Sequence, residues 1–443
     1  MNVTWMFLWL LSFLLFTADG KKRVCLIGAG LSGLFSVKLL ADRLDEFEPI
    51  VFERNSDVGG LWIYTDDTGL DKYGLPIHSS VYKNLRTNSP KEVMSFPDYQ
   101  HFEGEKRSCV KHHTVVDYQK NYTDHFNLRQ FIKFNTYVEK VIPLSEIDNW
   151  RVNRWIIKTR DLHSNSTDAT ICDFVMVCTG QYYKPMIPTI LGIKKYKGRV
   201  LHSHSYRKPE EFSGQTVTVL GAAVSGQDIT FELSLYAKIV YLSHRHDKLQ
   251  GEMPRNVIQV PGIAAADTNG FILTNGMRIE SDSLIFCTGY VNELPFLNIN
   301  SGIEVHDKYL YPLYKQVINI NNPSMGFVGL VPTFRASTPK FYSQAKYFIS
   351  FLQGQFKLPS REKMIMDAEN MLPKSIKNKK YEWHWDYIMG LAKEANFEPI
   401  PEFYQKGLTF WQKFQDENLY HFKEYDLRFL VDGSVEIVKS KMA

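Results

Sequence analysis

The sequence predicts an α/β protein that contains the same strand–turn–helix unit twice. The first unit is RVCLIGAGLSGLFSVKLL, which begins at Arg23 and is followed by the strand-like run EPIVFER. The second is TVTVLGAAVSGQDITFELSL, which begins at Thr216 and is followed by AKIVYLSHR. In each unit a β-rich run leads through a glycine turn into an amphipathic helix, the opening of a βαβ unit in a parallel sheet. With 443 residues, the chain has room for two or three domains.

The first glycine turn has the spacing G-x-G-x-x-G and consists of Gly28, Ala29, Gly30, Leu31, Ser32 and Gly33. The three glycines allow a tight turn, close approach of a pyrophosphate and packing of the helix on the strand. The helix N-terminus offers free N–H groups to the phosphate. Glu53 ends the second strand, where a carboxylate accepts hydrogen bonds from ribose hydroxyls. The turn predicts a Rossmann-like dinucleotide domain; a turn used only for packing is the alternative.

The segment after Glu53 favours a flavin nucleotide over NAD. It is DVGGLW, in which Gly60 allows close backbone approach, and Leu61 and Trp62 follow, Trp62 adding a flat apolar wall. We therefore expect FAD in the first unit.

The second glycine turn keeps Gly221 and Gly226 but has Ala223 where the second glycine is usual. The tight turn and the helix contact survive this change, and Ser225 adds a hydroxyl near the helix start. The next strand ends in Ser243, His244 and Arg245 rather than in an acid. An acid would repel a 2′-phosphate, whereas Arg245 can bind it with two hydrogen bonds. The second unit therefore predicts NADPH rather than NADH; a solvated basic loop is the alternative.

Two further strands, DFVMVCTGQY at 173–182 and DSLIFCTGY at 282–290, both end in Thr-Gly. In two-nucleotide flavoproteins such strands carry the chain between domains. We expect an FAD domain at 21–185, an NADPH domain inserted at 186–290, and the second part of the FAD domain with a helical C-terminal region at 291–443. The fold class is thus two Rossmann-like domains, one inserted in a discontinuous other.

Residues 1–20 are predicted to be a cleaved signal peptide. The run from Trp5 to Phe16 is apolar apart from Ser12, and small Ala18 and Gly20 precede a basic stretch. An uncleaved anchor or a buried first helix is the alternative. No later stretch is long and apolar enough to span a membrane, so no stable membrane anchor is expected. The net charge of +4 is spread along the chain, which gives no support for a nucleic-acid partner.

The five cysteines include no CxxC pair, so a disulfide framework is not expected. Cys25, Cys178 and Cys287 lie in apolar strand-like runs and are interpreted as buried, inert thiols.

Asn121 and Asn165 begin glycosylation triplets, which matter if the chain is secreted. His202 and His204 have no third ligand at metal spacing, so no metal site is expected.

Together these motifs resemble the flavin-containing monooxygenases. The family's linker F-x-G-x-x-x-H-x-x-x-[FY] appears with Tyr196, Gly198, His202 and Tyr206. GAAVSGQD resembles the family's second loop, with Ala223 as the departure, and adds Gln227 and Asp228 to the expected NADPH site. SVYKNLRTNSPKEV looks like the segment beside the flavin, which implies roles for Thr87, Asn88 and Ser89. FYSQAKYF implies that Gln344 lies near the flavin.

The resemblance implies an enzyme that uses FAD, NADPH and O₂. A C4a-hydroperoxyflavin would oxygenate a small-molecule amine or sulfide to an N-oxide or S-oxide, with Asn88 nearest the reactive centre. A secretory start is similar to insect members of the family, some of which N-oxygenate plant pyrrolizidine alkaloids such as senecionine, so detoxification and a secreted location are expected. A location in the lumen of the endoplasmic reticulum and a homo-oligomeric state remain open. A Baeyer–Villiger ketone oxygenase and a secreted, non-catalytic flavin-binding protein are the alternatives.

Overall fold

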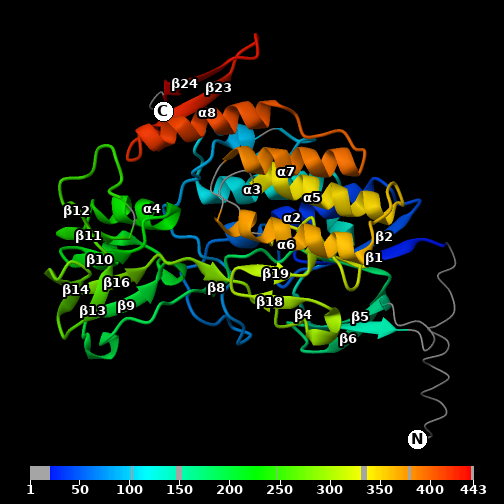
Figure 1. The fold of residues 1–443 in the computed structure, drawn as a ribbon, viewed down its shortest axis with the longest axis horizontal. Helices are drawn as coiled ribbons and strands as arrows, with labels where there is room; N and C mark the ends of the chain where they lie inside the picture. The colour runs from blue at the N-terminus through cyan, green and yellow to red at the C-terminus, as the bar shows by residue number, and fades with distance from the viewer. Residues whose placement is uncertain are drawn as a thin grey trace, which may run out of the picture.

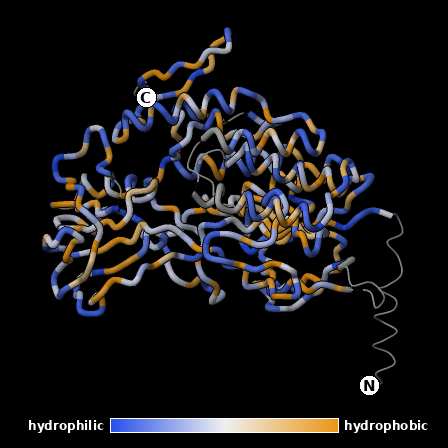
Figure 2. Tube along the Cα trace, in the orientation of Figure 1, coloured by the Kyte–Doolittle hydropathy of each residue, from blue (hydrophilic) through white to orange (hydrophobic). Residues whose placement is uncertain are grey.

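Two sheets, one mixed and one parallel, form the body of the molecule together with the helices that cover them (Figure 1). The computed structural model of the chain describes residues 20–440 apart from 101, 103, 146–151, 246, 331–336 and 378–380. The predicted signal peptide lies outside the described residues, except for Gly20. Apolar segments gather in the strands and in the helix faces that cover them (Figure 2).

The first sheet has seven strands in the order β20-β21-β22-β7-β1-β2-β3. Its strands are β1 (Lys22–Ile27), β2 (Phe47–Phe52), β3 (Ile132–Lys133), β7 (Phe174–Val177), β20 (Leu313–Tyr314), β21 (Ile318–Asn319) and β22 (Met325–Phe327). β1 runs parallel to β2 on one side and to β7 on the other. The predicted βαβ opening is therefore present, with α2 (Leu31–Ala41) between β1 and β2. We call this sheet and its covering elements the first unit.

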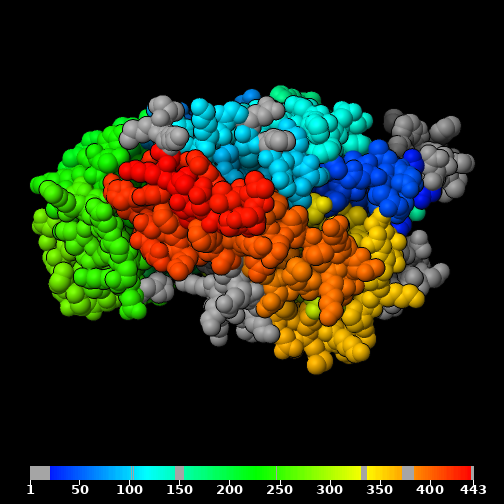
Figure 3. Space-filling model, turned by 90° about the horizontal axis from the view of Figure 1, so that it is seen from above, coloured from blue at the N-terminus to red at the C-terminus, as the bar shows by residue number. Residues whose placement is uncertain are grey.

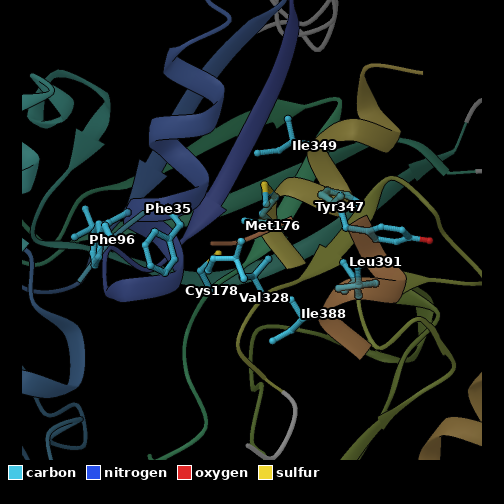
Figure 4. Close-up of a cluster of buried hydrophobic side chains, with 14 of the residues drawn as sticks. Phe35, Phe96, Met176, Cys178, Val328, Tyr347, Ile349, Ile388 and Leu391 are labelled. Carbon is cyan, nitrogen blue, oxygen red and sulfur yellow. The ribbon is translucent and has the colours of Figure 1, made fainter. Parts of the chain in front are cut away.

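The two faces of β1 are buried against different layers, as the period-2 alternation of a strand requires. Val24 and Leu26 belong to a core that they share with helices, whereas Cys25 and Ile27 face a three-stranded antiparallel sheet. Figure 4 shows part of the helix-side core, where Phe35 of α2, Met176 of β7 and Ile388 lie close together. The helices on this side are α2, α3 (His112–His125), α5 (Ser337–Leu352), α6 (Arg361–Lys377), α7 (Tyr381–Glu394) and α8 (Phe403–Glu417).

The interpretation of Cys25 as an inert thiol is wrong. Cys25 forms a disulfide with Cys172, with the Cα atoms 5.9 Å apart and both residues fully buried. The antiparallel sheet of β4 (Thr136–Ser145), β5 (Val152–Asp161) and β6 (Thr167–Cys172) brings Cys172 to the face of β1 that Cys25 occupies. Cys178 and Cys287 are buried free thiols, as predicted, and burial raises the pKa of each to about 12.

The second unit repeats this plan around a five-stranded parallel sheet in the order β12-β11-β10-β16-β9. Its strands are β9 (Arg199–His202), β10 (Thr216–Leu220), β11 (Ile239–Ser243), β12 (Val257–Val260) and β16 (Ser283–Phe286). α4 (Val224–Leu233) packs on one face. The other face carries an antiparallel sheet of β13 (Ile263–Ala266), β14 (Gly270–Leu273) and β15 (Arg278–Glu280).

A short antiparallel pair joins the two units. β8 (Lys184–Pro185) pairs with β17 (Tyr290–Val291), at the two positions where the sequence predicts the chain to cross between domains. After it come the hairpin of β18 (Glu304–His306) and β19 (Tyr309–Tyr311) and the return to the first sheet. At the C-terminus a hairpin of β23 (Tyr425–Phe429) and β24 (Val435–Lys439), absent from the sequence prediction, lies beside α8 (Figure 1). Across the described ranges, no helix combines the length and apolar character needed to cross a bilayer.

Candidate nucleotide-binding sites

A cavity of about 340 Å³ opens where β1, β2 and β7 end in the first unit. The carboxyl edge of a parallel sheet is where nucleotides bind in α/β folds. The predicted site residues in its wall are Gly28, Gly30, Leu31, Ser32, Glu53, Gly60, Leu61, Trp62, Thr87, Asn88 and Ser89. Ala29, Gly33 and Gln344 are predicted site residues that do not line it.

The first glycine turn has the geometry that a pyrophosphate requires. Gly28 has φ +102°, and a Cβ there would lie 2.8 Å from the carbonyl oxygen of Cys178. A Cβ on Gly33 would overlap the carbonyl oxygen of Gly28, so the helix packs on the turn only with glycine. Gly60 has φ +51°, and a Cβ on it would lie 2.9 Å from the Cα of Gly30. Two bare backbone segments thus meet at the cavity wall beside the N-terminus of α2, and the site fits a dinucleotide.

Glu53 connects the second strand to the turn. It is 4% exposed, and its carboxylate accepts hydrogen bonds from the N–H of Ala29 at 2.7 Å and of Asn55 at 2.8 Å. Burial raises the pKa of Glu53, and the two N–H donors counteract that shift. Ala29 therefore belongs to the site through its backbone, although its own side chain is buried in the core.

Asn88 lies half-buried in the cavity wall, on a segment held from both ends. The Thr87 hydroxyl accepts a hydrogen bond from the N–H of Val110 at 3.1 Å, and the carbonyl oxygen of Asn88 accepts one from the indole of Trp411 at 3.0 Å. Trp411 comes from α8, more than three hundred residues later in the chain. The sequence does not predict this contact, because nothing in its local pattern connects Trp411 to Asn88.

Gln344 contacts the cavity wall indirectly, through the backbone of Gly329. Its side chain is fully buried; its amide oxygen accepts from the N–H of Gly329 at 3.0 Å, and its amide nitrogen donates to the Tyr387 hydroxyl at 3.0 Å. Gly329 lines the cavity. Gln344 thus fixes the cavity wall from behind and does not face its interior.

Several cavity residues were not predicted, including His78, Thr136, Gln181, Tyr182 and Phe341. Gln181 and Tyr182 directly follow the Thr-Gly end of β7, which was assigned only to the domain crossing. His78 stacks on Tyr183, with ring centroids 5.6 Å apart, and burial lowers the pKa of its imidazole to about 4. No sequence pattern marks it.

The second glycine turn repeats the packing of the first. A Cβ on Gly221, which has φ +114°, would overlap the carbonyl oxygen of Cys287, and one on Gly226 would overlap that of Gly221. Ala223, the N-cap of α4, has φ −78° and ψ −173°; Gly30, the N-cap of α2, has φ −81° and ψ −167°. This conformation suits any residue, and both Ala223 and Ser225 are exposed. The methyl therefore causes no backbone strain.

Of the remaining predicted residues of the second unit, some bind other parts of the protein and others lie near the turn without such contacts. Arg245 is exposed just beyond β11, on the edge that the turn occupies. The Ser243 hydroxyl donates to the carbonyl oxygen of Pro261 at 2.8 Å, and Gln227 donates to that of Ala222 at 2.8 Å. Asp228 points elsewhere, to Tyr82 and Lys423. The groups that remain to contact a nucleotide are therefore the backbone of the turn, Ser225 and Arg245.

His202 and His204 both hold backbone groups. A ring nitrogen of His202 is 3.0 Å from the carbonyl oxygen of Gly289, its other ring nitrogen accepts from the N–H of His204, and His204 lies 3.0 Å from the carbonyl oxygen of Ile77. Among the residues that the structure describes, no group of three or more His, Cys, Asp or Glu side chains could hold a metal ion.

The chain is similar to known proteins over most of its length. The family model described as flavin-binding monooxygenase-like matches residues 21–250 and 247–397. Senecionine N-oxygenase of Tyria jacobaeae is 36% identical over 429 residues, which cover 94% of this chain and 91% of that protein. S-allyl-L-cysteine S-oxygenase of Allium sativum superposes with a TM-score of 0.81 at 29% identity, covering 91% of this chain and 95% of the other. Tmm from a Pelagibacter strain gives 0.82 at 28% identity, with coverages of 93% and 95%.

The family match spans both glycine turns, the linker between them and the return to the first sheet. The fold class predicted from the sequence, with two Rossmann-like units, is confirmed by the parallel strands beside each glycine turn and by these structural relatives. The chain belongs to the flavin-containing monooxygenase family, as an enzyme that depends on FAD and NADPH.

Proposed function

We propose that this enzyme transfers one oxygen atom of O₂ to the nitrogen or sulfur of a soft nucleophile. The observation that carries the proposal is the cavity in which the first glycine turn, Gly60 and Asn88 share one wall. The proposed substrate class is tertiary amines of the pyrrolizidine alkaloid type, such as senecionine, which would make detoxification its role. The likeness to senecionine N-oxygenase over 94% of the chain supports that class.

In this proposal the first unit holds FAD and the second holds NADPH. Gly28, Gly30 and the N-terminus of α2 bind the FAD pyrophosphate, and Glu53 accepts from the ribose hydroxyls. The turn from Gly221 to Gly226 binds the NADPH pyrophosphate, and Arg245 binds the 2′-phosphate. When bound, the flavin would supply the redox chemistry between NADPH and O₂.

The chain's own contribution is to position groups and exclude water. In the proposal Asn88 donates its side-chain amide toward the reacting atoms or bound NADP⁺; its position in the cavity lining and the hydrogen bond from Trp411 to its carbonyl oxygen support this role. Apolar and aromatic side chains around it, among them Phe96, Phe102 and Phe341, keep the cavity dry.

A substrate panel on the purified full chain tests the function. Senecionine, a simple tertiary amine, a thioether and a cyclic ketone are each supplied with NADPH, and NADPH consumption is followed together with H₂O₂ release. The proposal predicts N-oxide or S-oxide formation matched to NADPH consumption. Lactone formation from the ketone alone would identify a Baeyer–Villiger oxygenase. Absence of NADPH oxidation with every compound would identify a non-catalytic flavin-binding protein.

We propose further that the protein folds in an oxidising compartment and is secreted, and that Asn165 carries a glycan. The buried Cys25–Cys172 disulfide is typical of such compartments. Asn165 lies in an exposed turn with φ +57°, whereas Thr123 of the other triplet is fully buried and donates to the carbonyl oxygen of Gln119 at 2.7 Å. Glycosidase treatment of secreted wild type should shift its mass, and N165Q should abolish the shift while N121Q retains it. A retained shift in N165Q would contradict this assignment.

A further inference from the structure

Two carboxylates of α4 accept hydrogen bonds from residues 82–84, a segment that leads into the cavity wall of the first unit. Asp228 and Glu232 are one helical turn apart, so they share a face of the helix. The hydroxyl of Tyr82 donates to one oxygen of Asp228. The amide of Asn84 donates to Glu232 at 2.8 Å. This segment continues through Arg86 to Thr87 and Asn88 in the cavity wall.

The C-terminal residues Lys423 and Glu424 contact both Asp228 and the segment after Tyr82. Lys423 Nζ forms an ion pair with the second oxygen of Asp228 and also donates to the carbonyl oxygen of Arg86 at 3.1 Å. The guanidinium of Arg86 in turn donates to the carbonyl oxygen of Lys423 and to Glu424. Figure 3 shows the C-terminal segment lying across the junction, against both the second unit and the segment that follows residue 80.

These contacts are shielded from water. The side chains of Lys423 and Asp228 are 14% and 18% exposed, and Tyr82 is buried at 6%. Shielded ion pairs are costly to break singly, because the remaining charge loses its partner in a poorly solvated place. Both carboxylate oxygens of Asp228 already have partners within the protein, so Asp228 has a different role from the phosphate-facing residues of the turn.

We propose that Asp228 is a positioning residue that locks the NADPH-binding helix onto the segment carrying Asn88, with Tyr82 and Lys423 as its partners. This rests on the proposed function, because it assigns the two nucleotides to the two units. Asp228 lies one helical turn from the phosphate-binding end of α4, and Tyr82 lies six residues before Asn88. The contact therefore sets the register between the two cofactor sites. A misplacement of about 1 Å between reacting groups can cost on the order of a hundredfold in rate.

The test compares D228N, Y82F and K423M with D267N. Asp267 pairs with Arg278 on the surface of the same unit and so provides a matched loss of an ion pair. On the FAD-loaded protein without substrate, amide hydrogen exchange is measured over residues 83–88, and NADP⁺ affinity is measured by titration calorimetry. Stopped-flow spectroscopy then gives the rate of anaerobic flavin reduction at saturating NADPH.

The proposal predicts that D228N, Y82F and K423M all retain FAD, exchange faster over 83–88, and reduce flavin at least about tenfold more slowly than wild type. The loss in D228N combined with K423M should be smaller than the sum of the two single losses, because both substitutions remove the same Asp228–Lys423 ion pair. D228E, which preserves the charge, should recover part of the rate. D267N should match wild type in every measurement.

Three results would overturn the proposal. If D228N, Y82F and K423M all showed the amide exchange and the flavin reduction rate of wild type, the contact would have no positioning role. Weaker NADP⁺ binding in D228N but not in Y82F or K423M would make Asp228 a direct cofactor ligand. Additive losses in the double variant would show that Asp228 and Lys423 act separately. A wild-type enzyme that binds both nucleotides yet oxygenates nothing would overturn the proposed function, while the exchange experiment would still decide the role of Asp228.

Discussion

At the scale of single residues, the clearest difference between the two sites is the charge at the end of the second strand of each unit. Glu53 is buried and holds the first turn, whereas Arg245 is exposed beyond β11. A buried carboxylate beside a ribose disfavours a phosphate there, and an exposed guanidinium attracts one. The two sites should thus take different nucleotides for an electrostatic reason.

Replacing Arg245 by Ala should weaken NADPH binding by ~1.5–3 kcal/mol, the usual range for a hydrogen bond to a charged group. NADH lacks the 2′-phosphate, so its binding should be unchanged and the preference for NADPH should narrow. Steady-state kinetics with both nucleotides measures the ratio directly. An unchanged NADPH/NADH ratio would remove Arg245 from the site.

Replacing Asn88 by Ala should uncouple NADPH oxidation from substrate oxygenation, with H₂O₂ released instead of product. The physical reason is the loss of an amide donor in the cavity wall while the backbone, held by Trp411, stays in place. The measurement is H₂O₂ formed per NADPH consumed. N300A, at an exposed turn position, is the control and should remain coupled. A fully coupled N88A would exclude Asn88 from the reaction.

At this scale the sequence predicts what depends on local spacing. The glycines at 28 and 33, with Glu53, form a site because their spacing along one βαβ unit fixes their geometry. Gln344 and Asp228 were expected to contact cofactors, yet each binds partners more than forty residues away in sequence. Contacts between residues far apart in the chain cannot be predicted from the spacing of residues in a single sequence.

At the scale of elements, both helices begin with the same N-cap conformation although one N-cap is Gly30 and the other Ala223. The third glycine of each turn, by contrast, is the contact between helix and strand. This geometry predicts that Ala223 is tolerated in the turn and that Gly226 is required there.

Two substitutions in the second turn should separate these roles. A223G should leave NADPH affinity close to that of wild type, because Ala223 already has the backbone conformation that Gly30 has at the N-cap of α2. G226A should abolish NADPH binding while leaving FAD bound, because its Cβ would overlap the carbonyl oxygen of Gly221. NADP⁺ titration of the FAD-loaded variants measures both. Normal affinity in G226A would contradict the packing described for this turn.

The sequence predicts the two βαβ openings well because apolar periodicity and glycine turns are local. It misses the antiparallel sheets β4–β6 and β13–β15 and the β23–β24 hairpin. The strands of the hairpin are mostly half-buried, and the residues from 355 onward mix lysine, glutamate and aromatics in a way that also suits helices. Only their packing partners in the fold select the strand conformation.

At the scale of the whole molecule, one disulfide ties the central sheet of the first unit to the antiparallel sheet beneath it. It joins residues 147 apart in sequence. The alternation along β1 predicts that Cys25 is buried, but it does not say which layer covers that face, so the bond could not be predicted. The domain limits near 185 and 290 remain predictions, which the β8–β17 pair supports.

Replacing both Cys25 and Cys172 by Ala should lower the free energy of unfolding by about 2–4 kcal/mol, because the cross-link restricts the unfolded chain. Denaturant unfolding followed by fluorescence measures this. A reductant should destabilise wild type toward the variant and leave the variant unchanged. Equal stability of wild type and variant would show that the cross-link contributes nothing.

The proposed function requires the two nucleotide units to lie so that a nicotinamide held by one reaches a flavin held by the other. Anaerobic titration of the purified FAD-loaded protein with NADPH, followed by flavin absorbance, measures this directly. We expect a yellow protein whose flavin is fully reduced by one equivalent of NADPH and reoxidised on admission of air. A flavin that stays oxidised with NADPH present, or a chain that remains colourless when FAD is supplied, would contradict it.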